Sequence, residues 1–110
     1  MTTTRMTVTA ESVRDELLER YAGEGVARGS MFGSLAIKLD GKVLATFRDD
    51  RAVVKVGRDS PLLVESLANG GHLFDPSGKN RPMKDWLVIE GATPDELAPY
   101  LLEAIALHRA

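Results

Sequence analysis

The sequence predicts an α+β fold of two layers, in which an antiparallel sheet is packed by helices. Four segments with the two-residue period of strands follow one another over residues 26–56, joined by tight turns, as is typical of antiparallel hairpins. Segments with helical period lie before and after them, so helices and strands are segregated along the chain. The chain has 110 residues, the length of one domain. The predicted order is therefore α-β-β-β-β-α-β-β-α.

The first nine residues carry no periodic pattern. They are rich in threonine, and we expect residues 1–9 to form a flexible lead-in. Residues 10–110 are expected to form a single domain, because no repeat or internal linker interrupts them. Met6 is an alternative start to Met1, and the sequence does not distinguish the two.

Residues 10–22 have the spacing of an amphipathic helix. Val13, Leu17 and Tyr21 recur every four residues and would face the core. Thr9 is the expected N-cap, because its hydroxyl can accept a hydrogen bond from a free N–H of the first turn. Two glycines after the last of these positions end the helix.

Four strands are expected next, over residues 26–32, 35–39, 42–48 and 52–56. Asp40-Gly41 joins the middle two, and this dipeptide is a strong hairpin signal. A second tight turn at Asp49-Asp50-Arg51 leads into the last strand. Within that strand, Ala52, Val54 and Val56 share one face and are expected to be buried.

The register of the middle hairpin has two solutions. A two-residue loop pairs Leu39 with Lys42, whereas a three-residue loop with Gly41 in the left-handed conformation pairs Lys38 with Lys42. We prefer the second, because register follows the buried face. In that register the apolar face contains Leu35, Ile37, Val43, Ala45 and Phe47.

The second half of the chain alternates between helix and strand. Ser60-Pro61 begins a helix as N-cap and first-turn proline, and residues 69–71 end it. A short strand over 72–74 and a polar loop over 75–82 follow. Residues 86–89 form a continuous apolar strand, consistent with burial on both faces. Its Trp86 is expected to pack in the core, with an anchor at a partner interface as the alternative.

The last helix begins at a capping box, Thr93-Pro94-Asp95-Glu96. Pro99 follows where its ring would clash with an earlier carbonyl. We therefore expect a short turn over 94–98 and the main helix from Pro99 to His108.

The helix that begins at Ser60-Pro61 is expected to bury an inner stripe that includes Leu63 and Leu67.

Composition excludes several classes of function. Cysteine is absent, which excludes disulfides, thiolate zinc sites, iron–sulfur clusters and a cysteine nucleophile. No apolar run approaches the length of a membrane span, and the N-terminus lacks the apolar core of a signal peptide, so a cytoplasmic location is expected.

Charge is unevenly distributed along the chain. The total is −2, from 14 basic and 16 acidic residues, which excludes a uniformly basic surface. Residues 26–58 nevertheless hold seven basic and three acidic side chains, a net of +4, and residues 79–84 add three basic ones. Residues 10–25 and 85–110 are acidic. Opposite charges can simply solvate opposite layers, or a basic sheet face can meet an anionic partner.

No catalytic or metal-binding constellation is found. His72 and His108 lie on different predicted elements, and neither has a metal-type partner one helical turn away. The adjacent carboxylates Asp49-Asp50 and Asp95-Glu96 are explained by turn and capping roles. We therefore expect no enzyme activity, no cofactor and no metal.

Several short motifs occur in a characteristic order. They are Arg28-Gly29-Ser30-Met31-Phe32-Gly33, Leu39-Asp40-Gly41-Lys42, Asp49-Asp50-Arg51, Val54-Lys55-Val56, Gly70-Gly71, Phe74-Asp75-Pro76 and Arg81-Pro82-Met83-Lys84-Asp85-Trp86-Leu87-Val88. Together they resemble the N-terminal domain of the TfoX/Sxy competence regulators, in the Arg-Pro-Met-Lys version of the small stand-alone members. The resemblance spans about residues 13–109.

The resemblance implies a two-layer α+β domain that acts by binding a protein partner. In the full-length regulators a second, helical domain follows, and the protein assists the cyclic-AMP receptor protein at competence promoters. That second domain is not expected here. The family implies no catalytic residues, so the expected function is a non-enzymatic module, an accessory in transcriptional regulation. The partner-binding residues that we expect are Arg28, Met31, Phe32, Arg81, Met83 and Lys84.

Three alternatives stay open. A small-molecule binder or enzyme would hold its ligand between the sheet and the 75–82 loop, where glycine, proline and basic groups concentrate. A structural homodimer would form through a sheet edge or through residues 86–89. Direct binding of DNA by the basic strands is a weaker alternative, which predicts a steep loss of affinity with salt.

Overall fold

The computed structural model describes residues 9–31, 33–48, 51–91 and 93–110. Its helices are α1 (Ala10–Arg20), the short 3-10 helix η1 (Ala22–Glu24), α2 (Pro61–Ala68) and α3 (Pro94–Arg109). Its strands are β1 (Ala27–Met31), β2 (Ser34–Leu39), β3 (Lys42–Arg48), β4 (Arg51–Lys55), β5 (His72–Phe74) and β6 (Met83–Glu90). The predicted α+β class and element order are confirmed.

The strands form one antiparallel sheet in the order β1-β2-β3-β4-β6-β5. Strand β6 inserts between β4 and β5, so it has a neighbour on each side. Leu87 and Val88 are both buried although successive strand residues point to opposite faces of a sheet.

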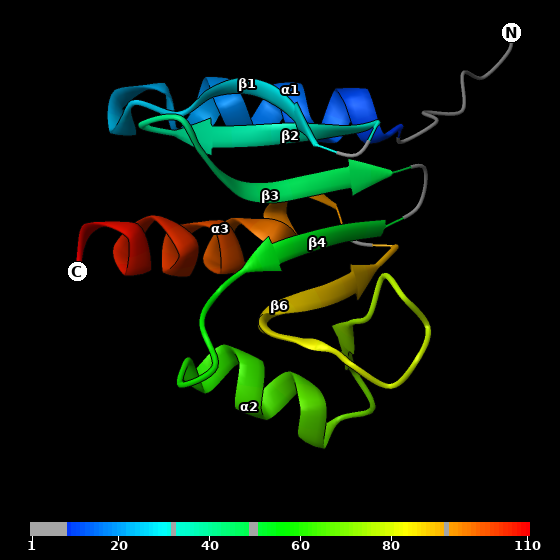
Figure 1. The fold of residues 1–110 in the computed structure, drawn as a ribbon. Coiled ribbons are helices and arrows are strands. Elements are labelled where there is room, and N and C mark those ends of the chain that lie inside the picture. Colours follow the sequence, from blue (N-terminus) through cyan, green and yellow to red (C-terminus); the bar gives the residue numbers. More distant parts are fainter. Residues whose placement is uncertain (1–8, 32, 49–50, 92) are drawn as a thin grey trace, which may run out of the picture.

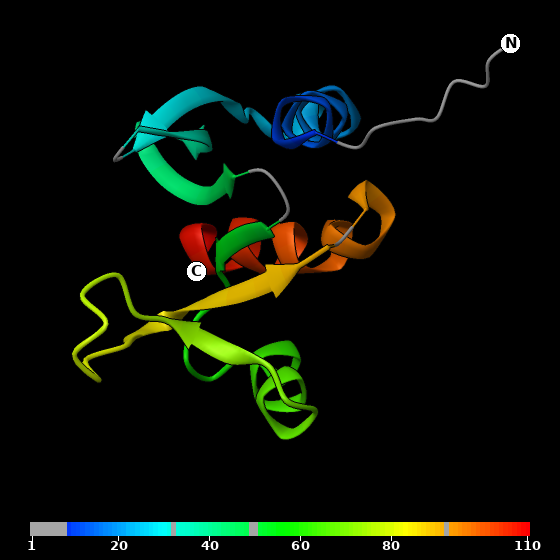
Figure 2. The same cartoon turned by 90° about the vertical axis from the view of Figure 1, so that its right-hand side faces the viewer.

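The helices cover one face of the sheet (Figures 1 and 2). Helix α1 packs on β2 and β3, α3 packs on β3 and β4, and α2 lies beside β5. No helix of the described chain covers the opposite face of the central strands, and the loop over residues 75–82 projects on that side (Figure 2). One face of the sheet is therefore left open, and we call it the uncovered face.

The main apolar core lies between the sheet and the helices. Ala52, Val54 and Val56 all belong to it, which confirms the buried face predicted for β4. Trp86 does not: it is half buried and lies outside the core. Because it alternates with the core residue Leu87 along β6, it points to the uncovered face.

The register preferred for the β2–β3 hairpin is wrong. Leu39 pairs with Lys42, so the loop has two residues. In that loop, Asp40 and Gly41 have φ angles of 52° and 79°. Two positive φ angles in succession match a type I′ turn, whose twist fits that of the flanking strands. An aspartate tolerates positive φ better than most residues, and this tolerance is the reason that Asp-Gly predicts a two-residue hairpin turn.

A bulge next to this turn restores the apolar face. The register shifts by one residue between Lys38 and Ile37, so that Ile37 pairs with Ala45. Ile37, Ala45 and Phe47 therefore lie in the core together, as predicted. The bulge also brings Leu44 into the core in place of Val43, which the prediction had buried.

The predicted interruption of the last helix is also wrong. Helix α3 runs from Pro94 to Arg109 with Pro99 inside it, after the predicted capping box, in which the Thr93 hydroxyl accepts a hydrogen bond from the Glu96 N–H at 3.3 Å. Pro99 is exposed and lies in the second turn. It removes only the hydrogen bond to the Asp95 carbonyl, which water can replace at an exposed position.

The two shorter helices differ from their predictions at single positions. Helix α1 ends at Arg20, and the 3-10 turn η1 carries the chain to the left-handed Gly25. In α2, Leu63 is buried as predicted, whereas Leu67 is 38% exposed. Helix α2 lies at the end of the sheet, where it meets β5 rather than a broad layer, so it buries a narrower stripe.

Candidate functional site

A row of small and apolar residues runs across the uncovered face. Ala36 pairs with Thr46, Thr46 pairs with Val53, and Val53 pairs with Val88. Each is at most 9% exposed, although none belongs to the main core. Their sequence neighbours are core residues, so these four point the other way. They form the floor of the uncovered face.

A depression with a volume of about 240 Å³ opens on this floor. It lies between strands β2–β4 and the start of the 75–82 loop. Its lining residues are Ser34, Thr46, Arg48, Arg51, Val53, Phe74 and Pro76. The lining of this depression thus combines two arginines and two hydroxyl-bearing residues with three apolar residues.

Two arginines stand directly opposite each other in this depression. Arg48 on β3 pairs with Arg51 on β4. Like charges in direct cross-strand opposition repel each other, and both of these side chains are exposed, so an anion in solution can reach them. The Arg48 Nε donates a hydrogen bond to the Ser34 Oγ at 2.7 Å, which orients that guanidinium. Residues 49–50, which connect the two strands, lie outside the described residues.

Three lysines extend the positive charge over the same face. Lys38, Lys55 and Lys84 fall on the uncovered face by strand alternation. A Cβ built on Gly29 would lie 2.6 Å from the Lys38 side chain, so Lys38 lies across β1 at that glycine. This close approach explains why a glycine interrupts the strand there.

One described carboxylate lies among these cations. Glu90 pairs with Arg51 across the β4–β6 ladder. The ion-pair contact recorded for Glu90 is with His72, at 3.9 Å between Oε2 and Nε2. A second described carboxylate, Asp75, lies between the lining residues Phe74 and Pro76, and its Oδ1 accepts hydrogen bonds from the Ser77 hydroxyl and the Gly78 N–H. Strand alternation therefore places five basic side chains on the uncovered face, with these two carboxylates near them.

The six predicted partner-binding residues do not form one cluster. Three strands separate β1 from β6, a span of roughly 19 Å at the usual strand spacing. Arg28 pairs with Ile37 and so points to the helix side, where its Nη2 lies 3.4 Å from the Asp15 Oδ1. Met31 pairs with Ser34 and borders the depression. Phe32 lies outside the described residues.

The second predicted group lies at the other end of the uncovered face. Arg81 is exposed in the loop, and Lys84 points from β6 to the uncovered face. Met83 is half buried and pairs with Phe74, a wall of the depression. Met31 and Lys84 thus border the face that holds the depression, Met83 pairs with one of its lining residues, and Arg28 points to the other face.

The aspartate of the Arg81–Trp86 motif has a structural partner. Asp85 Oδ1 accepts hydrogen bonds from the Arg58 backbone N–H at 2.9 Å and from its Nε at 3.1 Å. The side-chain hydrogen bond from Arg58 is the main reason that the pKa of Asp85 lies below its ordinary value. Asp85 therefore fixes the turn between β4 and α2.

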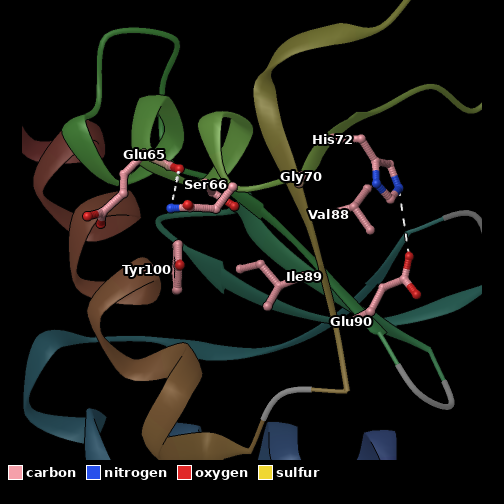
Figure 3. A pocket seen from close by; sticks show the side chains of 10 residues that line it. Glu65, Ser66, Gly70, His72, Val88, Ile89, Glu90 and Tyr100 are labelled. Carbon is pink, nitrogen blue, oxygen red and sulfur yellow. Dashed lines mark hydrogen bonds and ion pairs between the residues drawn. The ribbon is translucent and has the colours of Figure 1, made fainter.

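A larger pocket, of about 520 Å³, lies between α2, β5–β6 and α3. Figure 3 shows that its polar groups do not converge: Glu65 and Tyr100 lie on one side, and the His72–Glu90 pair lies on the other. The other histidine, His108, does not line this pocket. Its Nε2 lies 2.9 Å from the Asp40 Oδ2. We find no nucleophile–base arrangement in the pocket.

Comparison with known proteins adds no assignment. No protein-family model matches the chain, and no curated protein matches it significantly. Among the described residues, no group of three or more His, Asp or Glu side chains is arranged to hold a metal ion. None of the described helices is long and apolar enough to span a bilayer.

Sequence reasoning missed Ser34, Arg48 and Arg51 as site residues. The signal was partly present, because Arg48 ends a predicted strand and Arg51 lies in the predicted turn over residues 49–51, which keeps the two arginines close together without pairing them. The net charge of +4 over residues 26–58 also pointed to this segment. The alternative of a ligand between the sheet and the 75–82 loop pointed to the region of Pro76, but nothing in the sequence placed Phe74 beside the arginines, because β5 joins the sheet only through β6.

Proposed function

We propose that this protein is a non-enzymatic binding module that uses its uncovered basic face to hold an acidic segment of a protein partner. The observation that carries the proposal is the Arg48–Arg51 pair in direct opposition on a sheet face without a helix over it. An anionic group at this point relieves the repulsion between the guanidiniums, so binding is coupled to a gain in local stability.

Charge distribution favours a local acidic segment over a long polyanion. Helix α1 holds four acidic and two basic residues, and α3 holds three acidic and one basic, so each has a net charge of −2. A DNA duplex is longer than the uncovered face, so part of it would lie outside the basic side chains. A short acidic segment can stay on the basic face.

The resemblance to the TfoX/Sxy N-terminal domain supports the same kind of role. It implies a cytoplasmic accessory in transcriptional regulation that acts through another protein. Lys84 and Arg81, which belong to the motif that carries the resemblance, lie at one end of the uncovered face, and they extend the proposed binding surface towards the loop.

The test uses a labelled polyglutamate peptide and a labelled DNA duplex at equal ionic strength. We expect the peptide to bind with an affinity that falls as salt is added, and Arg51→Gln to weaken it about threefold to tenfold. Arg28→Gln is the matched control: it removes the same charge from a strand, on the other face, and should leave binding unchanged.

Two results would contradict the proposal. If both substitutions weaken the peptide equally, the attraction is a property of the net charge and not of the uncovered face. If the DNA duplex binds more tightly than the peptide, the ligand is nucleic acid and a protein partner is the wrong class.

A further inference from the structure

We infer that the Arg48–Arg51 depression is a subsite for a phosphate monoester that carries a small aromatic group. The inference rests on the proposed function, because the depression belongs to the same basic face. It adds the chemical class of the anion and the group attached to it.

The choice of phosphate follows from the two guanidiniums. A guanidinium is a rigid planar fork of donors that matches two oxygens of a phosphate, and two residues that carry such a fork line the same depression here. A phosphate monoester carries about −1.5 to −2 charges near neutral pH, enough to compensate both arginines, whereas a carboxylate carries one. Three acceptor oxygens also leave one for a hydroxyl of the lining.

The hydroxyl groups are placed to complete the phosphate site. Ser34 accepts a hydrogen bond from Arg48 Nε, so its own O–H proton is free to point elsewhere. Thr46 lies between Ala36 and Val53 on the floor of the depression. Both residues are only 9% exposed, whereas Arg48, Arg51 and Pro76 are exposed, so the hydroxyls lie at the buried end of the depression and the arginines at its solvent side.

The remaining wall determines what the phosphate is attached to. Val53, Phe74 and Pro76 give the depression an apolar side across from the arginines. An aromatic ring is favoured against Phe74, because ring pairs gain beyond the area that they bury. The volume of about 240 Å³ is below the usual range for drug-sized ligands and admits a phosphate with little more than one ring system.

The test titrates phenyl phosphate into isotope-labelled protein, with benzoate as the carboxylate analogue, at a pH where the phosphate is a dianion. We expect saturable backbone amide shifts that centre on Ser34, Thr46 and Val53, and binding of benzoate at least about tenfold weaker. Arg51→Gln should weaken phenyl phosphate about ten- to a hundredfold, and Arg28→Gln should leave it unchanged.

A conservative variant separates phosphate recognition from simple charge. Arg51→Lys keeps the charge and loses the planar fork, so it should weaken phenyl phosphate clearly more than it weakens polyglutamate. Equal binding of benzoate and phenyl phosphate, shifts centred outside the depression, or indifference to both Arg51 variants would overturn the inference. Adenosine monophosphate and free phosphotyrosine are titrated in the same way. The one that binds more tightly shows whether the phosphate belongs to a nucleotide or to a phosphorylated tyrosine.

Failure of the inference and failure of the proposed function give different results. If polyglutamate binds through the uncovered face and phenyl phosphate does not saturate, the face is an acidic-segment site without a phosphate subsite. If neither binds, both proposals are wrong.

Discussion

Replacing Gly71 by alanine tests how tightly the end of α2 is joined to β5. A Cβ at this position would lie 2.6 Å from the Ser66 Oγ and 2.8 Å from the Ser66 carbonyl oxygen. The hydroxyl can rotate away, but the carbonyl belongs to the helix backbone. It also accepts a hydrogen bond from the Gly71 N–H at 2.8 Å. The backbone at position 71 and the Ser66 carbonyl must therefore move apart by a few tenths of an ångström, which lengthens this hydrogen bond.

We expect Gly71→Ala to be about 1–3 kcal/mol less stable than a glycine-to-alanine variant without a clash. Weakening one backbone hydrogen bond contributes about 0.5–1.5 kcal/mol, and forcing an extra methyl into a packed contact contributes a similar amount. Against this stands a gain of about 0.4–1 kcal/mol, because alanine restricts the unfolded chain. Gly23→Ala has the same gain without the clash, since nothing lies within 4 Å of its Cβ. It is the matched control and should be neutral or stabilising.

Urea unfolding of both variants measures these free energies. A third variant, Gly71→Ala with Ser66→Ala, removes the hydroxyl and keeps the carbonyl contact, so it should recover only part of the loss. If Gly71→Ala is as stable as Gly23→Ala, the close contact with the Ser66 carbonyl does not constrain this junction, and the reasoning is refuted.

Two further predictions concern the core and the response to acid. Leu101→Ala should lower the free energy of unfolding by about 2–5 kcal/mol, because Leu101 is only 1% exposed. Leu102 is 45% exposed, so Leu102→Ala should lower it by under about 1 kcal/mol. Equal losses for the two variants in chemical denaturation would contradict the assigned helix face. The side-chain hydrogen bond from Arg58 lowers the pKa of Asp85 in the folded protein. The stabilisation that Asp85 gives is therefore complete above the pKa of this carboxyl in the unfolded chain, and it is lost as the pH falls through its pKa in the folded protein. Asp85→Asn should therefore flatten the loss of stability in acid, measured as melting temperature against pH; a parallel fall in both proteins would contradict this.

Local signals predicted the elements, because those signals act through neighbouring residues. The Thr93 capping box, the Asp40-Gly41 turn and the alternation of Ala52, Val54 and Val56 each involve groups a few residues apart. The errors arose where a tertiary contact changed a local preference. In the hairpin, the Asp40-Gly41 turn keeps its preferred two-residue form, and a bulge at Leu44 in the paired strand restores the apolar face. In α3, burial of apolar side chains outweighs the one hydrogen bond lost at Pro99.

By itself, the sequence determined an α+β chain without thiol chemistry and with a basic segment between acidic ones. It also placed Arg48 at the end of one predicted strand and Arg51 in the turn that follows, so the two arginines were expected to lie close together. Only the tertiary structure decided which face they share and what stands beside them. Insertion of β6 between β4 and β5 brings Phe74 and Pro76 to the arginines and leaves Arg28 with α1. Pairing between distant strands follows from complementary buried faces, and no local period encodes that choice.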